Sequence, residues 1–135
     1  MLEYLFAQRY NPHRAAERGV VFKVGRTTGP TMGVVSGCRA VIQTYQSKLW
    51  PVRSIEDTII SCSGTKYFAV KGDSGAPVYD AHGNGQFMVW GGLDPTLVDP
   101  EQHVVFATPV QAILHDVEAK LSQLLGHTNV KVTLA

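Results

Sequence analysis

Between residues 19 and 107 the sequence is a succession of short β-rich segments separated by turns that contain glycine or proline. Glycines inside the second segment predict bulges, and the Ala-His-Gly-Asn-Gly stretch at 81–85 predicts a hairpin loop. Residues 45–56, with Trp50 and Pro51, read as a connection. Six short strands at this spacing favour an all-β barrel or sandwich. The expected strands span residues 19–25, 32–42, 57–62, 76–80, 86–90 and 103–107.

A single helix is predicted after the last strand. Thr108 and Gln111 have the spacing of a capping box, Pro109 suits the first turn, and Gly126 suits the C-terminal end. The apolar residues fall on one continuous face, which we expect to pack on the sheet. They are Val110, Ile113, Leu114, Val117, Leu121 and Leu124.

The chain has 135 residues, which suits one domain: a lead-in at 1–18, the strands and helix at 19–126, and a tail at 127–135. Twelve basic and 11 acidic residues give a net charge of +1, so we expect no nucleic-acid partner. With no apolar run of about 20 residues and no signal-like start, we expect no membrane association and weakly favour the cytoplasm. Cys38 and Cys62 are expected to be buried free thiols, with one bridge between neighbouring strands as the alternative.

The Gly-Asp-Ser-Gly turn at residues 72–75 carries the main functional signal. Glycine on both sides of Asp73 and Ser74 lets the backbone turn sharply and lets another chain approach. Such a turn can direct the amides of Gly72 and Ser74 to one point beside the Ser74 hydroxyl. Two convergent N–H donors beside a nucleophile are what acyl transfer requires.

Four ordered motifs extend this signal, and together they resemble the C-terminal barrel of a trypsin-like (chymotrypsin-fold) serine peptidase, in particular fungal and bacterial trypsin-like peptidase domains. The resemblance covers roughly residues 19–125 and implies a six-stranded antiparallel barrel closed by a C-terminal helix. The motifs are Lys23–Gly29 with Thr31–Val35, Gly72–Val78, Val89–Gly91 and Phe106–Pro109.

The resemblance implies a role for each matching residue. Ser74 would attack the scissile carbonyl, and the amides of Gly72 and Ser74 would form the oxyanion hole. Val89, Trp90 and Gly91 would pair with the substrate backbone as an added strand. Residues 67–71, which include Phe68 and Lys71, would wall the specificity pocket with Gly91 and Gly92. Phe68 falls near the pocket base, which favours an apolar or small substrate side chain over Lys or Arg.

The general base that such an enzyme needs has no clear candidate in the sequence. In the family, a histidine and an aspartate come from a preceding barrel, and 18 residues before the first strand are too few to form one. His13 and Asp57 have the right order but the wrong context. His82, His115 and His127 are expected on the surface, and His103, which opens a strand near the pocket, is expected to be structural, with a role on the substrate side as the alternative.

We therefore expect a serine endopeptidase domain that lacks its histidine- and aspartate-bearing half and is inactive alone. Its partners would be a peptide or protein substrate and that N-terminal barrel, in the same or another chain; no metal or cofactor is expected. Asp73, whose family counterpart pairs with a freed amino terminus in enzymes activated by cleavage, is expected to bond within its own loop. The alternatives are an inactive peptide-binding or interaction module on the same fold and an inert truncated product.

Overall fold

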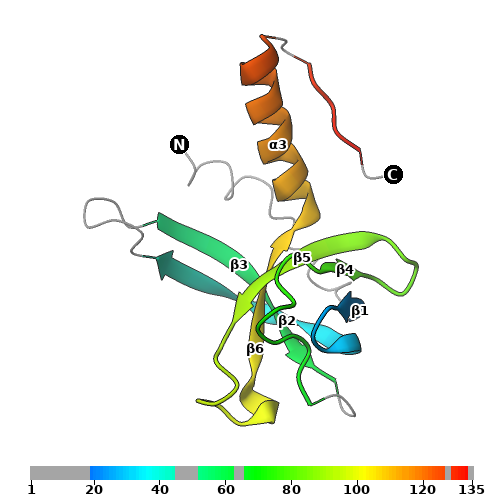
Figure 1. Ribbon diagram of the computed structural model, residues 1–135, viewed down its shortest axis with the longest axis vertical. Coiled ribbons are helices and arrows are strands. Elements are labelled where there is room, and N and C mark those ends of the chain that lie inside the picture. Colours follow the sequence, from blue (N-terminus) through cyan, green and yellow to red (C-terminus); the bar gives the residue numbers. More distant parts are fainter. Residues whose placement is uncertain (1–18, 45–51, 63–65, 127–128, 134–135) are drawn as a thin grey trace.

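The computed structural model describes residues 19–44, 52–62, 66–126 and 129–133. The predicted lead-in at 1–18, with His13, lies outside this part of the chain, as do His127 and the Trp50-Pro51 pair. Six strands are followed by one long helix (Figure 1). In chain order these are β1 (Val20–Gly25), β2 (Gly29–Thr44), β3 (Val52–Ser61), β4 (Pro77–Tyr79), β5 (Gly85–Gly92), a 3₁₀ turn (Pro100–Gln102), β6 (Val104–Pro109) and α3 (Val110–Leu125).

The six strands form a closed antiparallel barrel in the order β1-β2-β3-β6-β5-β4. This confirms the predicted fold class. The register of β2 on β3 shifts between Val35 and Arg39, so the glycine-containing stretch forms the predicted bulge. Closure leaves the barrel without a free edge along most of its strands.

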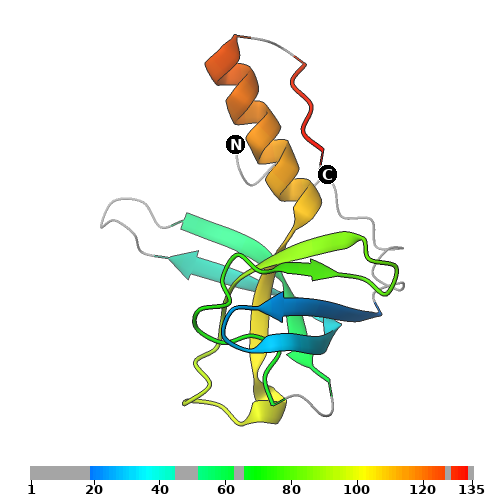
Figure 2. The ribbon, with the colours of Figure 1, turned by 45° about the vertical axis from the view of Figure 1, so that its right-hand side comes forward.

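Small and branched apolar side chains from all six strands fill the barrel, together with Phe68 and Ala69 from the segment between β3 and β4. Phe68 lies against Gly33, where an added Cβ would come within 2.7 Å of the Phe68 ring and 2.8 Å of Ile59. Glycine at 33 therefore makes room for Phe68, the largest fully buried apolar side chain. Figure 2 shows the strands crossing around this interior.

The strands β2 and β3 differ most from the prediction. β3 begins at Val52 and not at Asp57, and β2 continues to Thr44. Residues 39–44 pair with residues 52–57, and this two-stranded ribbon extends beyond the barrel (Figure 1). The prediction of a connection over 45–56 was therefore wrong for its last five residues. Its polar residues Arg53, Ser54 and Glu56 obscured the strand.

The helix is present, but its start and its packing differ from the prediction. Thr108 does not cap it: its hydroxyl donates to Glu56 Oε2 at 2.9 Å, and Pro109 is the residue that flanks the first turn. Gly126 ends the helix in the left-handed region, at φ 66°, as predicted.

The helix α3 contacts β5 and β6, but its apolar stripe is not buried on the barrel. Val110, Ile113, Leu114 and Leu121 are half-buried. β6 runs directly into α3 with no loop between them, so the helix extends outward from the barrel (Figures 1 and 2). No residue of α3 is buried, and Leu124 is 81% exposed. Residues 129–133 run back beside the helix, where the Val132 amide donates to Glu118 at 3.0 Å.

Candidate active site

Ser74 sits on a tight turn whose backbone is tied to β5. Gly72 and Gly75 have φ values of 103° and 88°, which a residue with a side chain adopts at a cost. The Gly75 amide donates to the Val89 carbonyl at 2.7 Å, and the Val89 amide donates to the Ala76 carbonyl at 3.0 Å. These two bonds fix Ser74 beside β5, where its exposed hydroxyl donates to the Trp90 carbonyl at 3.2 Å.

The amides of Gly72 and Ser74 have no hydrogen-bond acceptor within the described part of the chain. By contrast, the neighbouring amides of Asp73, Gly75 and Ala76 all donate to backbone carbonyls. Among the described residues, the turn thus satisfies the amides that flank Ser74 and leaves the two predicted oxyanion donors unused. Unpaired backbone donors beside an exposed hydroxyl are suited to binding a negatively charged oxygen.

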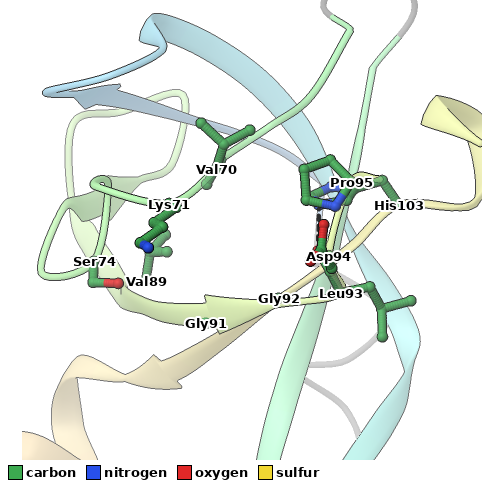
Figure 3. A pocket seen from close by; sticks show the side chains of 11 residues that line it. Val70, Lys71, Ser74, Val89, Gly91, Gly92, Leu93, Asp94, Pro95 and His103 are labelled. Carbon is green, nitrogen blue, oxygen red and sulfur yellow. Dashed lines mark hydrogen bonds between the residues drawn. The ribbon is translucent and has the colours of Figure 1, made fainter. Parts of the chain in front are cut away.

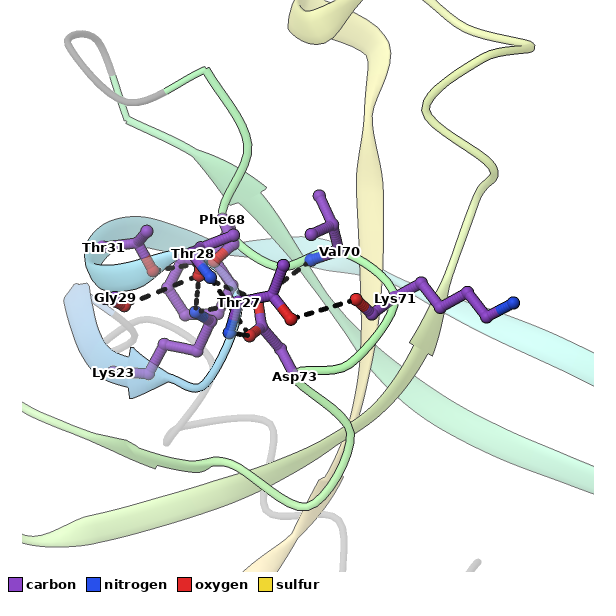
Figure 4. A network of polar contacts seen from close by, with 9 residues as sticks. All are labelled: Lys23, Thr27, Thr28, Gly29, Thr31, Phe68, Val70, Lys71 and Asp73. Carbon is purple, nitrogen blue, oxygen red and sulfur yellow. Dashed lines mark hydrogen bonds and ion pairs between the residues drawn. The ribbon is translucent and has the colours of Figure 1, made fainter.

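Asp73 anchors the turn through its carboxylate, and the residue is only 1% exposed (Figure 4). Oδ1 accepts from the amides of Thr27 (2.7 Å) and Thr28 (3.3 Å). Oδ2 accepts from the Thr28 hydroxyl (2.8 Å) and the Val70 amide (3.1 Å). The expectation that Asp73 bonds within its own loop holds only for Val70, because the other donors come from the β1–β2 turn.

Lys23 completes this buried cluster, with its ammonium 3.5 Å from Asp73 Oδ2 and 2.6 Å from the Thr28 hydroxyl. Both side chains of the ion pair are inaccessible to solvent. Burial acts to raise the pKa of Asp73, but hydrogen bonds from Thr27, Thr28 and Val70 outweigh it and lower the pKa to about 2. Burial lowers the pKa of Lys23, and Asp73 offsets part of that shift.

The approach of β1 to this cluster requires glycine at position 25. A Cβ on Gly25 would overlap the Asp73 carboxylate and come within 2.7 Å of Lys23 Nζ. Sequence reasoning missed Lys23, Thr27 and Thr28 as parts of the site. One sequence feature could have indicated Lys23. It alternates with Val21 and Gly25, and these three residues form the inward face of β1.

A cavity of about 440 Å³ opens beside Ser74 (Figure 3). Six of the residues predicted to pair with substrate or to wall the pocket line it with Ser74: Ala69, Val70, Lys71, Val89, Gly91 and Gly92. Phe68 does not, because it is fully buried in the barrel core, and its neighbour Ala69 lines the cavity instead. The cavity is lined by Ala69, Val70, Lys71, Ser74, Val89, Gly91, Gly92, Leu93, Asp94, Pro95 and His103.

Trp90 contributes its backbone and not its ring. It lies at a shift in the β5–β6 register between Val89 and Gly91, so its carbonyl reaches Ser74 while its ring lies 6.0 Å from that of Phe106. Within the segment predicted to pair with substrate, both backbone groups of Val89 are already bonded: its carbonyl accepts from Gly75 and its amide donates to Ala76. Gly91 and the adjoining Gly92 also line the cavity.

No histidine in the described ranges hydrogen-bonds to Ser74. His82 lies at the exposed hairpin tip, His115 lies on α3, and the buried His103 bonds the Leu93 carbonyl at 2.9 Å. Asp57 lies on β3, where Arg39 Nε is 3.4 Å from its carboxylate. The described residues thus bring together a hydroxyl and unused amides, but not a base.

The two cysteines form no disulfide bond with each other. Cys38 is exposed and Cys62 is half-buried, so the expectation of buried thiols was wrong for Cys38 and holds only in part for Cys62. Cys38 lies at the bulge between Val35 and Arg39, where the regular alternation of inward and outward side chains along β2 is interrupted. Among the residues the structure describes, no group of three or more His, Cys, Asp or Glu side chains could hold a metal ion.

The described part of the chain has no helix with the length and apolar character needed to cross a membrane. The sequence matches no protein-family model, and no curated protein matches it.

Proposed function

We propose that this chain is the nucleophile-bearing half of a serine endopeptidase of the trypsin-like kind. The observation that carries the proposal is the exposed Ser74 hydroxyl at a cavity, on a turn whose Gly72 and Ser74 amides have no acceptor among the described residues. Hydroxyl, unused donors and an adjoining cavity are the parts that acyl transfer needs on the nucleophile side.

In the proposed reaction, Ser74 Oγ attacks the carbonyl carbon of a peptide bond while its proton passes to a histidine base. The amides of Gly72 and Ser74 stabilise the resulting oxyanion. When the C–N bond breaks, the base returns the proton to the leaving amine, and an ester remains on Ser74. Water, deprotonated by the same base, then hydrolyses this ester.

The base and its orienting aspartate would come from a second structural unit, in the same chain or another. The exposed apolar residues of α3, Val117, Leu124 and Leu125, support this, because apolar area of this kind is normally covered in the working assembly. Residues such as Leu124 and Leu125 would then become buried only when the second unit is present.

Labelling with a fluorophosphonate probe tests the proposal. The 135-residue chain should be labelled weakly or not at all, whereas a preparation that includes the histidine- and aspartate-bearing half should be labelled rapidly. Ser74→Ala should abolish labelling, and Ser122→Ala, which changes a serine on α3, should not. Labelling that survives Ser74→Ala would contradict the proposal.

A peptide-binding module is the second candidate, favoured by the absence of a histidine contact to Ser74 among the described residues. In that case the cavity and Gly91–Gly92 would bind an extended peptide without chemistry. The two candidates differ in one result: a binding module holds peptides equally well after Ser74→Ala and is never labelled in any preparation.

A further inference from the structure

The hairpin between β4 and β5 ends in a loop that is organised around the carboxylate of Asp80. Oδ1 accepts from the backbone amides of His82 and Asn84, both at 2.9 Å. Oδ2 accepts from the side-chain amides of Asn84 at 3.0 Å and Gln86 at 2.9 Å. Among the residues that the structure describes, Asp80 is the one hydrogen-bond partner of the Asn84 carboxamide, and Asn84 itself is exposed.

The amide nitrogen that follows Asn84 is not used by the hairpin ladder. The Asp80 amide donates to the Asn84 carbonyl at 3.0 Å, as in a hydrogen-bonded pair of an antiparallel ladder. The next pair along the ladder, Tyr79 and Gly85, is therefore of the non-hydrogen-bonded kind. On the other side of β5, pairing with β6 begins only at Phe87, so no described strand takes the Gly85 N–H.

The residues on both sides of Asn84 are glycines, and this decides what its side chain can reach. Gly85 has no side chain to shield its nitrogen, and Gly83 turns the loop at a φ of 82°, in the left-handed region. A carboxamide next to an unshielded amide nitrogen is the arrangement in which asparagine cyclises on its own backbone. Asn84 and Gly85 therefore carry both reactants of that cyclisation.

We infer that Asn84 is a site of spontaneous succinimide formation, which Asp80 restrains. The Gly85 nitrogen forms a bond to Cγ of Asn84, and the Cγ–Nδ2 bond breaks. The proton lost from the Gly85 nitrogen leaves with Nδ2 as ammonia. Water then opens the ring at one of its two carbonyls, which gives aspartate or isoaspartate, and no further reactant is needed.

Asp80 restrains the reaction in two ways. Its hydrogen bond to Nδ2 limits the rotamers of Asn84, including those that bring Cγ to the Gly85 nitrogen. Hydrogen bonds, those from Asn84 first, also lower the pKa of Asp80, so its carboxylate is ionised at neutral pH. An ionised carboxylate has no proton to give to the leaving nitrogen.

The modification would open the hairpin tip. Both products place a new negative charge beside Asp80 and remove the Nδ2 donor, so two carboxylates would repel each other where one bond now holds the loop. Isoaspartate also adds a carbon atom to the main chain directly before β5, which disturbs the pairing of Tyr79 with Gly85.

The test incubates the full chain in mildly alkaline buffer and follows isoaspartate at each asparagine by peptide mass spectrometry and by enzymatic methylation. Asn129 is the internal control, because it is also exposed but is followed by the branched Val130. Isoaspartate should accumulate at Asn84 and not at Asn129. Asp80→Ala, which frees the carboxamide from a bond to a charged group, should raise the rate at Asn84 about tenfold.

Two further variants keep the result interpretable. Asp80→Asn keeps an acceptor in the loop without the charge and should give an intermediate rate, and Gly85→Ala should slow the reaction several-fold. The comparison of Asn84 with Asn129 in the wild type holds even if a variant fails to fold. Equal rates at the two asparagines, no isoaspartate at Asn84, or an unchanged rate in folded Asp80→Ala would each overturn the inference.

Discussion

Charged side chains are usually exposed and apolar ones buried, but two regions of this molecule show the opposite: the Lys23–Asp73 cluster next to the Ser74 turn, and the end of α3 at Leu124 and Leu125. Lys23 and Asp73 are charged and inaccessible to solvent, whereas Leu124 and Leu125 are apolar and exposed. The buried pair is satisfied by donors from two segments of the chain, so it is complete as it stands. Leu124 and Leu125 have no such cover within the described residues. The comparison therefore sets a charged site that is satisfied within the barrel against apolar side chains that the described residues leave exposed.

The largest effect is expected from breaking the buried pair. Asp73→Asn removes the carboxylate and leaves the Lys23 ammonium buried without its counter-charge. The free energy of unfolding, measured by urea denaturation, should fall by about 3–5 kcal/mol. Asp116→Asn is the matched control, since it breaks the exposed pair with Lys120 on α3 and should cost at most about 0.5 kcal/mol. Equal losses in the two variants would contradict the distinction between the regions.

Crowding the same cluster should cost less. Gly25→Ala would place a methyl group against the Asp73 carboxylate and force the end of β1 away from the turn that carries Asp73, at a cost of about 1–3 kcal/mol. Gly37→Ala adds the same methyl group where no atom lies within 4 Å and should leave the urea midpoint nearly unchanged. If both alanines are tolerated equally, β1 does not approach Asp73 as described.

Acid should weaken the cluster within a defined pH window. The pKa of Asp73 is about 2 in the folded chain and about 3.9 in an unfolded one. A carboxyl with a lowered folded pKa stabilises the fold fully above its unfolded pKa and loses that contribution as the pH falls through the folded value. About 2 kcal/mol should therefore be lost between about pH 4 and pH 2. Urea titrations at several pH values should show this loss in the wild type and not in Asp73→Asn.

The smallest effect on stability is expected from the helix. Leu124→Glu replaces a side chain that is 81% exposed and should change the free energy of unfolding by less than about 0.5 kcal/mol. Association with the histidine-bearing half, measured by sedimentation, should weaken clearly, because a charge would enter an apolar contact. Gln111→Glu, an exposed polar position of the same helix, is the control and should leave association intact.

The barrel and the Gly-Asp-Ser-Gly turn were predictable because both depend on short-range sequence: β-rich segments, glycine turns and a hydroxyl between glycines. The anchoring of Asp73 was not, since Lys23 lies 50 residues away in the chain. The hydropathy of β1 also misleads, because Val20, Phe22 and Val24 are exposed while Lys23 is buried. An alternating pattern indicates a strand, but it does not show which face is buried when a residue on one face pairs with a charge that is distant in the sequence.

A shift of one residue also explains why Phe68 lies in the core while its neighbour Ala69 lines the cavity. In an extended segment neighbouring side chains point in opposite directions, so a small error in loop length moves a residue from the cavity to the core. The helix was predicted from its own sequence, but its packing depends on what lies beyond it. Because β6 continues directly into α3, the helix extends outward and its stripe is not buried, which the periodicity of the stripe does not encode.

The most direct test of the central claim is the addition of a peptidyl boronic acid, because boron accepts the Ser74 oxygen without the help of a strong base. The account predicts a tetrahedral ¹¹B signal that Ser74→Ala abolishes, together with large shifts of the Gly72 and Ser74 amide resonances as they bind the boronate oxygen. A tetrahedral adduct that leaves both amides unshifted, or no adduct on Ser74 at all, would contradict a nucleophile with an oxyanion site.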